Sequence, residues 1–516
     1  MDKQSIKIII ISTLFMYIGL FEYSSVTVVL PSLSSALDIS STLTNWISIT
    51  FLLFCTAFGL TFGTIIPKYG INKVAKISVI SMIIGGLIAT FILNPWTLIF
   101  ARAIEGISAA SMFLISYLLI IQNIDSEKVG LALGIVTAGG FFSSISAPII
   151  GGVLSSFLPP QSIFAFSIPL SLICLILLCT LKIEWKENVE IDYLGTAFWV
   201  ITMILFIYGV SYLKSTVGIA CLILSVVFLV IFVLYELKAE HPLYDFRLLK
   251  NKIYAINNYA AMMGCFIKDG MVFVLTLYLQ YAKGFTAMET GFFISLIAVI
   301  MFITSPIAGR LSDKMDSVRL SNAGANLMVI STLIICLVRY LPSWSIIVSI
   351  VCLALGYALF DTPNKKIILE SSEESQLSYV TAFLSTIRDF GMLLPTAIFT
   401  LSLSMFSGIR HGAKYWGTSS EFLFVLFFIV ALSIIILNAQ VNKREVVFKF
   451  NYNQITKPIT NTVGGVIDNV SEVPEFVKGT VTESKDKVID TVSDVPDNLS
   501  NTADNIEILK YLRKKK

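Results

Sequence analysis

Long apolar runs recur along the whole chain and narrow its possible folds more than any other feature. Each run holds about 20 residues, the length that a helix needs to cross the hydrocarbon core of a membrane. A helix also satisfies its own backbone hydrogen bonds inside lipid, so the runs predict an all-α integral membrane protein. We place about fourteen spans, at residues 6–30, 44–66, 74–94, 97–121, 130–154, 163–182, 193–213, 217–236, 254–281, 289–309, 320–340, 344–363, 377–404 and 420–440.

Composition and loop charges support this interpretation. Of the 516 residues, 56% are hydrophobic and only 14% are charged, and the mean hydropathy is +0.82, which is unlike a soluble protein. Lys and Arg gather in alternate loops, a bias that predicts cytoplasmic N- and C-termini. The net charge of +3 does not indicate nucleic-acid binding. The seven scattered Cys predict neither a disulfide framework nor a metal site.

Two spans near the N-terminus carry a charged motif. In the first span, residues 21–31 read F-E-Y-S-S-V-T-V-V-L-P. In the fourth span, residues 102–110 read R-A-I-E-G-I-S-A-A. Charged residues inside a membrane are costly and usually face a cavity or a partner, so both motifs are candidates for function.

The fifth span carries a motif of small residues. Gly134 precedes the stretch A-P-I-I-G-G, which contains Pro148, Gly151 and Gly152. Small residues at such positions predict close approach of a neighbouring helix, and Pro148 permits a bend.

A loop motif occurs twice. The better copy, G-R-L-S-D-K, follows the tenth span and contains Gly309, Asp313 and Lys314. The carboxylate of Asp313 and the cations of this loop, such as Lys314, are expected to pair across a helix junction. In the copy after the second span, Pro67 stands where the acid is expected. The motif residues that remain in that copy are Gly63, Lys68 and Gly70.

In this order the motifs resemble those of the fourteen-span drug:proton antiporters of the major facilitator superfamily. The first is similar to L-D-x-T-x-V-N-x-A-L-P with Glu22 in place of Asp, the second to R-x-x-Q-G-x-G-A-A, and the third to G…G-P-x-x-G-G. Residues 192–195 and 236–249 are similar to the segments that bracket two inserted spans in this branch. The resemblance implies a major facilitator fold: two six-helix bundles around a central cavity, with the two inserted helices outside.

The expected layout has four parts. They are an N-terminal six-helix bundle at 1–182, two inserted helices with a cytoplasmic linker at 183–252, a C-terminal six-helix bundle at 253–440 and a polar cytoplasmic tail at 441–516. The tail holds a weak repeat, at 466–474 and again at 488–496. It is either disordered or an amphipathic segment that lies on membrane lipid.

Three ionisable residues share one depth in the N-terminal bundle. With a rise of about 1.5 Å per residue, Glu22, Arg102 and Glu105 fall well inside their spans. We predict that these are proton-coupling residues, with Glu22 as the titrating group and Arg102 as its conformation-dependent partner. The alternative is that Arg102 and Glu105 form a permanent structural pair.

The C-terminal bundle contains further deep charges. Asp269 is either a second proton or cation site or part of an ion pair with Lys268 or Arg388. Adjacent helix residues point about 100° apart, so Lys268 and Asp269 are not expected to face one partner. Lys268, Arg388 and Asp389 are predicted to line the substrate cavity or to act as charge partners. Asp361 is expected near the cytoplasmic surface, where it would be solvated.

These features together predict a proton-coupled exporter of hydrophobic, cationic compounds in a prokaryotic cytoplasmic membrane. Its partners would be a small-molecule substrate, protons and membrane lipids; we expect a monomer with no cofactor, metal or nucleic acid. Export of a lipid, siderophore or metabolite remains open, as does a non-transporting sensor or scaffold. An ATP-driven pump or an enzyme is disfavoured, because the sequence has no G-x-x-x-x-G-K-[ST], H-E-x-x-H or G-x-S-x-G motif.

Overall fold

The computed structural model describes residues 3–439 apart from short gaps. The gaps are residues 39–40, 92–93, 182, 184, 187–188, 214, 241, 343, 373–375 and 406–415. Within the described ranges the regular elements are helices, and none is a strand. The tail expected at 441–516, with its repeat, lies outside the described residues.

The N-terminal part forms seven α-helices that share a buried apolar cluster. They are α1 (Lys3–Leu37), α2 (Ser41–Gly59), α3 (Phe62–Tyr69), α4 (Ile71–Phe91), α5 (Pro95–Asn123), α6 (Val129–Phe157) and α7 (Ser167–Cys179). Local sequence starts α5, because Asn94 accepts a hydrogen bond from the Trp96 amide and Pro95 occupies the first helical position. Helices α2 and α3 meet at an angle of 62° and together cover one predicted span.

Helices α8 (Tyr193–Ser211) and α9 (Thr216–Glu236) form a hairpin at the place of the expected inserted pair. Asp192 and Ser215 cap them by accepting hydrogen bonds from backbone amides three residues ahead. The hairpin contacts α2, where the Trp46 indole donates a hydrogen bond of 2.9 Å to the Tyr212 hydroxyl. Much of α9 is apolar and exposed, as expected of a helix that faces lipid.

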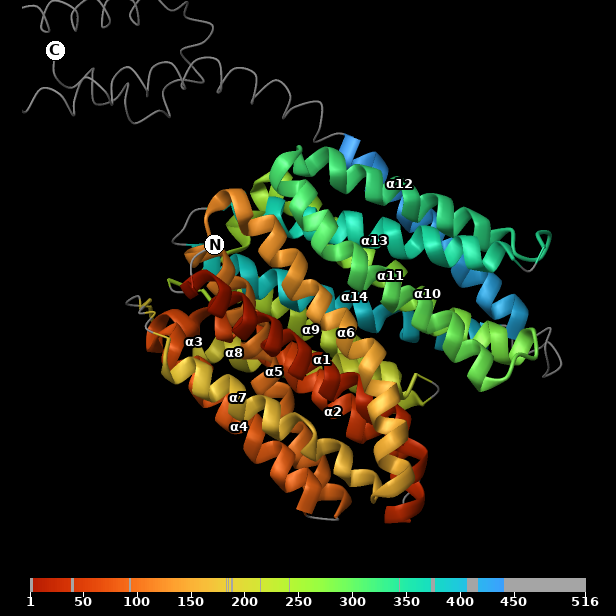
Figure 1. Cartoon of the computed structure of the whole chain (residues 1–516), viewed down its shortest axis with the longest axis horizontal. Coiled ribbons are helices and arrows are strands. Elements are labelled where there is room, and N and C mark those ends of the chain that lie inside the picture. Colours follow the sequence, from red (N-terminus) through yellow and green to blue (C-terminus); the bar gives the residue numbers. More distant parts are fainter. Residues whose placement is uncertain are drawn as a thin grey trace, which may run out of the picture. The chain divides into compact units, whose positions relative to one another are not determined.

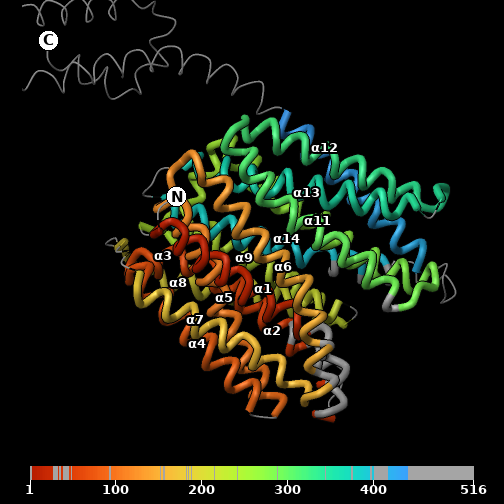
Figure 2. The backbone as a smooth tube through the Cα atoms, in the orientation of Figure 1, coloured from red at the N-terminus to blue at the C-terminus, as the bar shows by residue number. Residues whose placement is uncertain are grey.

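The remaining helices surround a second buried cluster. They are α10 (Lys252–Leu277), α11 (Ala287–Lys314), α12 (Ser317–Cys336), α13 (Ser345–Glu370), α14 (Leu377–Met405) and the helix Trp416–Ala439. Figures 1 and 2 show α10–α13 grouped on one side and α1–α5 with α7 on the other. Helix α6 of the N-terminal group and helix α14 of the C-terminal group lie where the two groups meet.

The number of spans agrees with the sequence. Twelve described helices are long and apolar enough to cross a membrane, and the bent pair α2 and α3 would be a thirteenth. Helix α14 does not meet that criterion, and it contains the charged residues Arg388 and Asp389.

The two groups of helices meet where α6 passes α11. A Cβ atom on Gly130 would lie 2.5 Å from the Gly309 carbonyl oxygen, and one on Gly134 would lie 3.0 Å from the Cα of Pro306. Only glycine permits this approach, so Gly134 and Gly309 bring the two backbones together.

Candidate functional site

Helices α1 and α5 bring Glu22, Arg102 and Glu105 into one buried cluster. The Arg102 Nη1 atom lies 3.1 Å from Glu22 Oε2 and 2.6 Å from Glu105 Oε2, and all three side chains are 0% exposed. The Arg102 Nη2 atom also donates to the Glu22 backbone carbonyl oxygen at 3.1 Å. Both the predicted partnership and the alternative pair of Arg102 with Glu105 are therefore present as contacts.

The surroundings of this triad are largely apolar, with the Ser167 hydroxyl on α7 as a polar neighbour of Glu22. The guanidinium carbon of Arg102 lies 4.4 Å from the centre of the Phe51 ring and 5.7 Å from that of Phe164. One carboxylate oxygen of Glu22 and one of Glu105 have no hydrogen-bond partner. Two buried carboxylates thus share one guanidinium, and the triad carries one negative charge when both are ionised.

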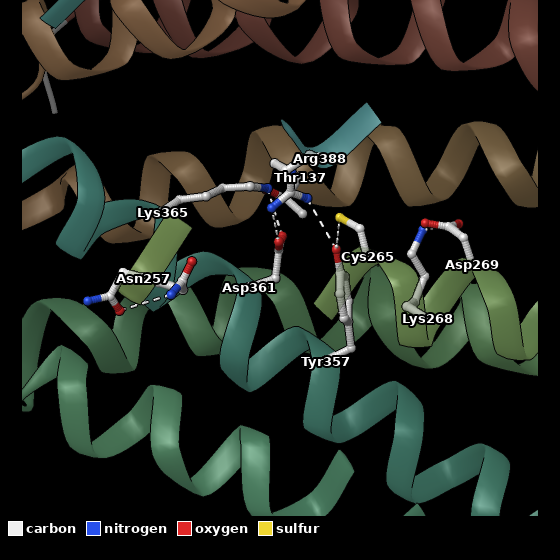
Figure 3. Close-up of polar contacts among 10 residues, drawn as sticks. Thr137, Asn257, Cys265, Lys268, Asp269, Tyr357, Asp361, Lys365 and Arg388 are labelled. Atoms are coloured by element: carbon white, nitrogen blue, oxygen red, sulfur yellow. Dashed lines mark hydrogen bonds and ion pairs between the residues drawn. The ribbon is translucent and has the colours of Figure 1, made fainter. Parts of the chain in front are cut away.

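A second charged cluster lies on α13 and α14. Asp361 accepts hydrogen bonds from Lys365, at 2.7 Å, and from Arg388 (Figure 3). Arg388 Nη2 also lies 3.2 Å from the Tyr357 hydroxyl, and Lys365 Nζ lies 3.1 Å from Thr137 Oγ1 on α6. Lys365 therefore contacts both groups of helices.

The prediction that Asp361 is solvated is wrong. Its side chain is 1% exposed, because α14 covers it with Arg388 and the next turn of α13 covers it with Lys365. Lys365 is not among the site residues predicted from the sequence. The spacing of four residues between Asp361 and Lys365 on one helix was the available signal.

Lys268 and Asp269 pair with each other on α10. Lys268 Nζ lies 2.5 Å from Asp269 Oδ1, and the side chains are 13% and 27% exposed. Of the alternatives for Asp269, the structure contains the ion pair with Lys268, whereas Arg388 is engaged by Asp361. The Cys55 thiol on α2 donates a weak hydrogen bond of 4.0 Å to Asp389 Oδ2.

The better copy of the loop motif joins the two groups of helices. Asp313 accepts hydrogen bonds from the backbone amides of Gly130 and Leu131, at 2.7 and 2.8 Å, where α6 begins. Lys366 on α13 pairs with the same carboxylate at 2.7 Å, whereas Lys314 is exposed. A carboxylate at a helix N-terminus is favoured by the helix dipole. We call Asp313, its two amide donors and Lys366 the latch.

The decayed copy makes a weaker junction between α3 and α14. The Ser378 hydroxyl donates a hydrogen bond to the Gly63 carbonyl oxygen at 2.6 Å. The Ala382 methyl group packs against Gly63, where an added Cβ atom would lie only 2.9 Å from it. Gly70 has a positive φ of 89°, which ends α3. Lys68 is partly buried in the last turn of that helix.

The residues of the small-residue motif of α6 lie in different environments. Gly134 packs against α11, as described above, whereas Pro148 is exposed inside the helix. Gly151 and Gly152 lie in the last third of α6. Among the described residues, no group of three or more His, Cys, Asp or Glu side chains could hold a metal ion.

Comparisons with known proteins give one family. The model described as "Major Facilitator Superfamily" matches residues 9–396. The riboflavin transporter RibZ of Clostridioides difficile (strain 630) is 26% identical over 405 residues, which cover 77% of this chain and 88% of that protein. The multidrug resistance protein Stp of Mycobacterium tuberculosis (strain CDC 1551 / Oshkosh) is 22% identical over 406 residues, covering 77% and 76%.

Solved structures show the same fold. The human organic anion transporter MFSD10 superposes with a TM-score of 0.63 at 13% identity, covering 85% of this chain and 100% of that one. The proton:xylose symporter XylE superposes with a TM-score of 0.60 at 14% identity, covering 84% and 96%. At these identities the likeness concerns the fold and not the substrate.

Proposed function

We propose that this protein, which belongs to the Major Facilitator Superfamily, exports hydrophobic, cationic compounds in exchange for protons. Membership confirms the resemblance drawn from the motifs and the all-α fold with two helical bundles and an inserted pair. It also makes the chain a multi-pass membrane transporter and not an enzyme. Proton coupling, export and the cationic substrate are our proposal, as are a monomer and cytoplasmic termini.

The buried triad carries the proposal. With Glu22 and Glu105 both ionised, one negative charge is left in an apolar environment, which is unfavourable, and uptake of one proton neutralises it. Arg102 and Glu105 share α5, whereas Glu22 lies on α1. A movement of α1 relative to α5 therefore changes the contact of Glu22 but not that of Glu105. Such a movement can couple proton binding at Glu22 to alternating access.

Proton exchange through Glu22 can be tested in inverted membrane vesicles. A pH gradient is imposed, ethidium is added, and the gradient is followed for wild type, Glu22→Gln and the exposed control Glu127→Gln. We expect ethidium to dissipate the gradient with wild type and the control, and at least tenfold more slowly with Glu22→Gln, because an amide cannot carry the proton. An equal response of all three proteins would remove Glu22 as the proton carrier.

A metabolite is the second candidate substrate. The likeness to a protein named as a riboflavin transporter favours it, since that relative covers 77% of this chain. Adding riboflavin instead of ethidium to the same vesicles separates the two. Gradient dissipation with riboflavin alone would favour metabolite transport over drug export.

A further inference from the structure

The ion pair on α10 has an aromatic neighbour. Lys268 Nζ, which lies 2.5 Å from Asp269 Oδ1, is also 5.5 Å from the centre of the Tyr357 ring on α13. A carboxylate beside the face of an aromatic ring is a favourable environment for an organic cation. The ammonium group of Lys268 occupies that environment in this structure (Figure 3).

The ring is held in place from its hydroxyl end. Tyr357 is 1% exposed, and its hydroxyl lies 3.2 Å from Arg388 Nη2 and 3.3 Å from Cys265 Sγ. Arg388 is itself paired with Asp361. The Tyr357 ring therefore cannot turn away without breaking the second charged cluster, which makes it a fixed wall.

Lys268 is the mobile member of this group. Its side chain has four rotatable methylene groups and is 13% exposed, and Asp269 is 27% exposed. By contrast, the three side chains of the triad are 0% exposed. The Asp269 Oδ2 atom has no hydrogen-bond partner. Among the described residues, Lys268 is the only ion-pair partner of this carboxylate.

Asp269 also has an electrostatic neighbour on α1. The carboxylates of Asp269 and Asp389 both lie within electrostatic range of the Tyr23 hydroxyl on α1, and Tyr23 is the neighbour of Glu22. The Asp269 carboxylate is therefore close enough to α1 to interact with a polar side chain of that helix.

We propose that Asp269 and the Tyr357 ring form a binding site for organic monocations and that Lys268 is its tethered occupant. A cationic substrate binds by displacing the lysine ammonium group from Asp269. The inference rests on the proposed function, of which it specifies the substrate site. In this proposal Lys268 competes with cationic substrates for Asp269. It does not serve to attract an anionic substrate.

A tethered competitor lowers the affinity for a cation without preventing its binding. A group on a short flexible linker has an effective concentration in the millimolar range or above, against which a free cation must compete. Neutral compounds gain nothing from Asp269 and do not need to displace the lysine. Removal of the ammonium group should therefore tighten the binding of cations selectively.

The test measures ethidium binding to the purified full-length protein by fluorescence anisotropy, without a pH gradient. Lys268→Met keeps an unbranched side chain but removes the charge, and we expect it to lower the Kd for ethidium about tenfold. Asp269→Asn and the double variant Lys268→Met with Asp269→Asn should both bind ethidium more weakly than Lys268→Met does. Lys283→Met is the matched control, because Lys283 lies 5.7 Å from the centre of the Tyr278 ring and is exposed.

An unchanged or higher Kd for folded Lys268→Met would overturn the inference. If Lys268→Met does not fold, Asp269→Asn keeps the test open, because loss of the carboxylate should raise the Kd for ethidium above that of wild type: an affinity equal to that of wild type would also overturn the inference. Binding is measured without proton exchange, so failure here is distinct from failure of the Glu22 experiment. If neither wild type nor Lys268→Met binds ethidium, the cation site and the cationic substrate class both fall, and proton coupling through Glu22 is then tested in the vesicles with riboflavin in place of ethidium.

Discussion

Arg102 is the shared ion-pair partner of two carboxylates, those of Glu22 and Glu105, that have no contact with solvent. A buried charge is tolerated only when it is paired, since water cannot stabilise it. The arrangement differs from that of Lys268 and Asp269, which are partly exposed and can separate at lower cost. At the scale of single residues, exposure therefore divides these deep charges into a fully buried set and a partly exposed set in this structure.

Removal of Arg102 should destabilise the protein through its charge. Arg102→Met leaves Glu22 and Glu105 without a cation, and breaking a buried pair in this way costs about 3–5 kcal/mol. Unfolding by SDS from mixed micelles measures this loss. The triple variant that adds Glu22→Gln and Glu105→Gln should recover part of the loss, because no buried charge is then unpaired. Equal losses in the single and triple variants would assign the effect to packing around Phe51.

At the scale of elements, two carboxylates converge on Gly195 of α8. Asp192 caps α8 at its first turn, and Glu236 at the end of α9 accepts a hydrogen bond of 3.3 Å from the Tyr244 amide. Each carboxylate has one oxygen without a partner. A Cβ atom on Gly195 would lie 2.6 Å from Asp192 Oδ2 and even nearer to the Glu236 carboxylate. Gly195 thus allows the hairpin to close.

Gly195→Ala should loosen the hairpin. The added methyl group overlaps both carboxylates, and overpacking of this kind costs about 1–3 kcal/mol. The control is Gly291→Ala in α11, where no atom lies within 4 Å of the new Cβ. That change should be neutral or stabilise the protein by about 0.5–1 kcal/mol. Thermal unfolding in detergent measures both, and a Gly195→Ala protein as stable as wild type would mean that the two carboxylate side chains move aside without cost.

The break between α2 and α3 shows what a hydropathy pattern misses at this scale. The apolar run predicts one span at 44–66, whereas the structure has two helices at an angle of 62°. Both sides of the break pack closely against α14, since Cβ atoms on Gly59 and Gly63 would lie 3.0 Å from Thr386 Oγ1 and 2.9 Å from Ala382 Cβ. Hydropathy describes which residues enter lipid, and it contains no information on which helix they meet.

At the scale of the whole molecule, the latch holds the two bundles together at one end. Asp313 on α11 binds the first amides of α6, which belong to the other bundle, and Lys366 neutralises its charge. In the decayed copy of the motif, a hydrogen bond between two uncharged groups, from the Ser378 hydroxyl to the Gly63 carbonyl oxygen, belongs to the corresponding junction. We therefore expect the latch to be the stronger of the two junctions. Opening it in an alternating-access cycle should cost more free energy than opening the junction between Ser378 and Gly63.

Asp313→Asn should weaken the latch. Hydrogen bonds to a charged group contribute about 1.5–3 kcal/mol, so we expect amide exchange at Gly130 and Leu131 to rise about tenfold or more. Hydrogen–deuterium exchange of the peptide at the start of α6 measures this directly. Lys314→Gln is the control, because Lys314 is exposed and takes no part in the latch. Unchanged exchange in Asp313→Asn would mean that the latch does not limit opening at this end.

The sequence by itself determined the fold class, the approximate number of spans and the identity of the family. Apolar runs and loop charges are local properties, and inside lipid a helix is the structure that satisfies an isolated backbone segment. Only the tertiary structure decided which charges meet: Asp361 with Arg388 across two helices, Asp313 with amides of the other bundle, and Lys268 with its own neighbour. These pairings depend on helix rotation, on distances between helices and on the reach of a long side chain, none of which a periodic pattern specifies.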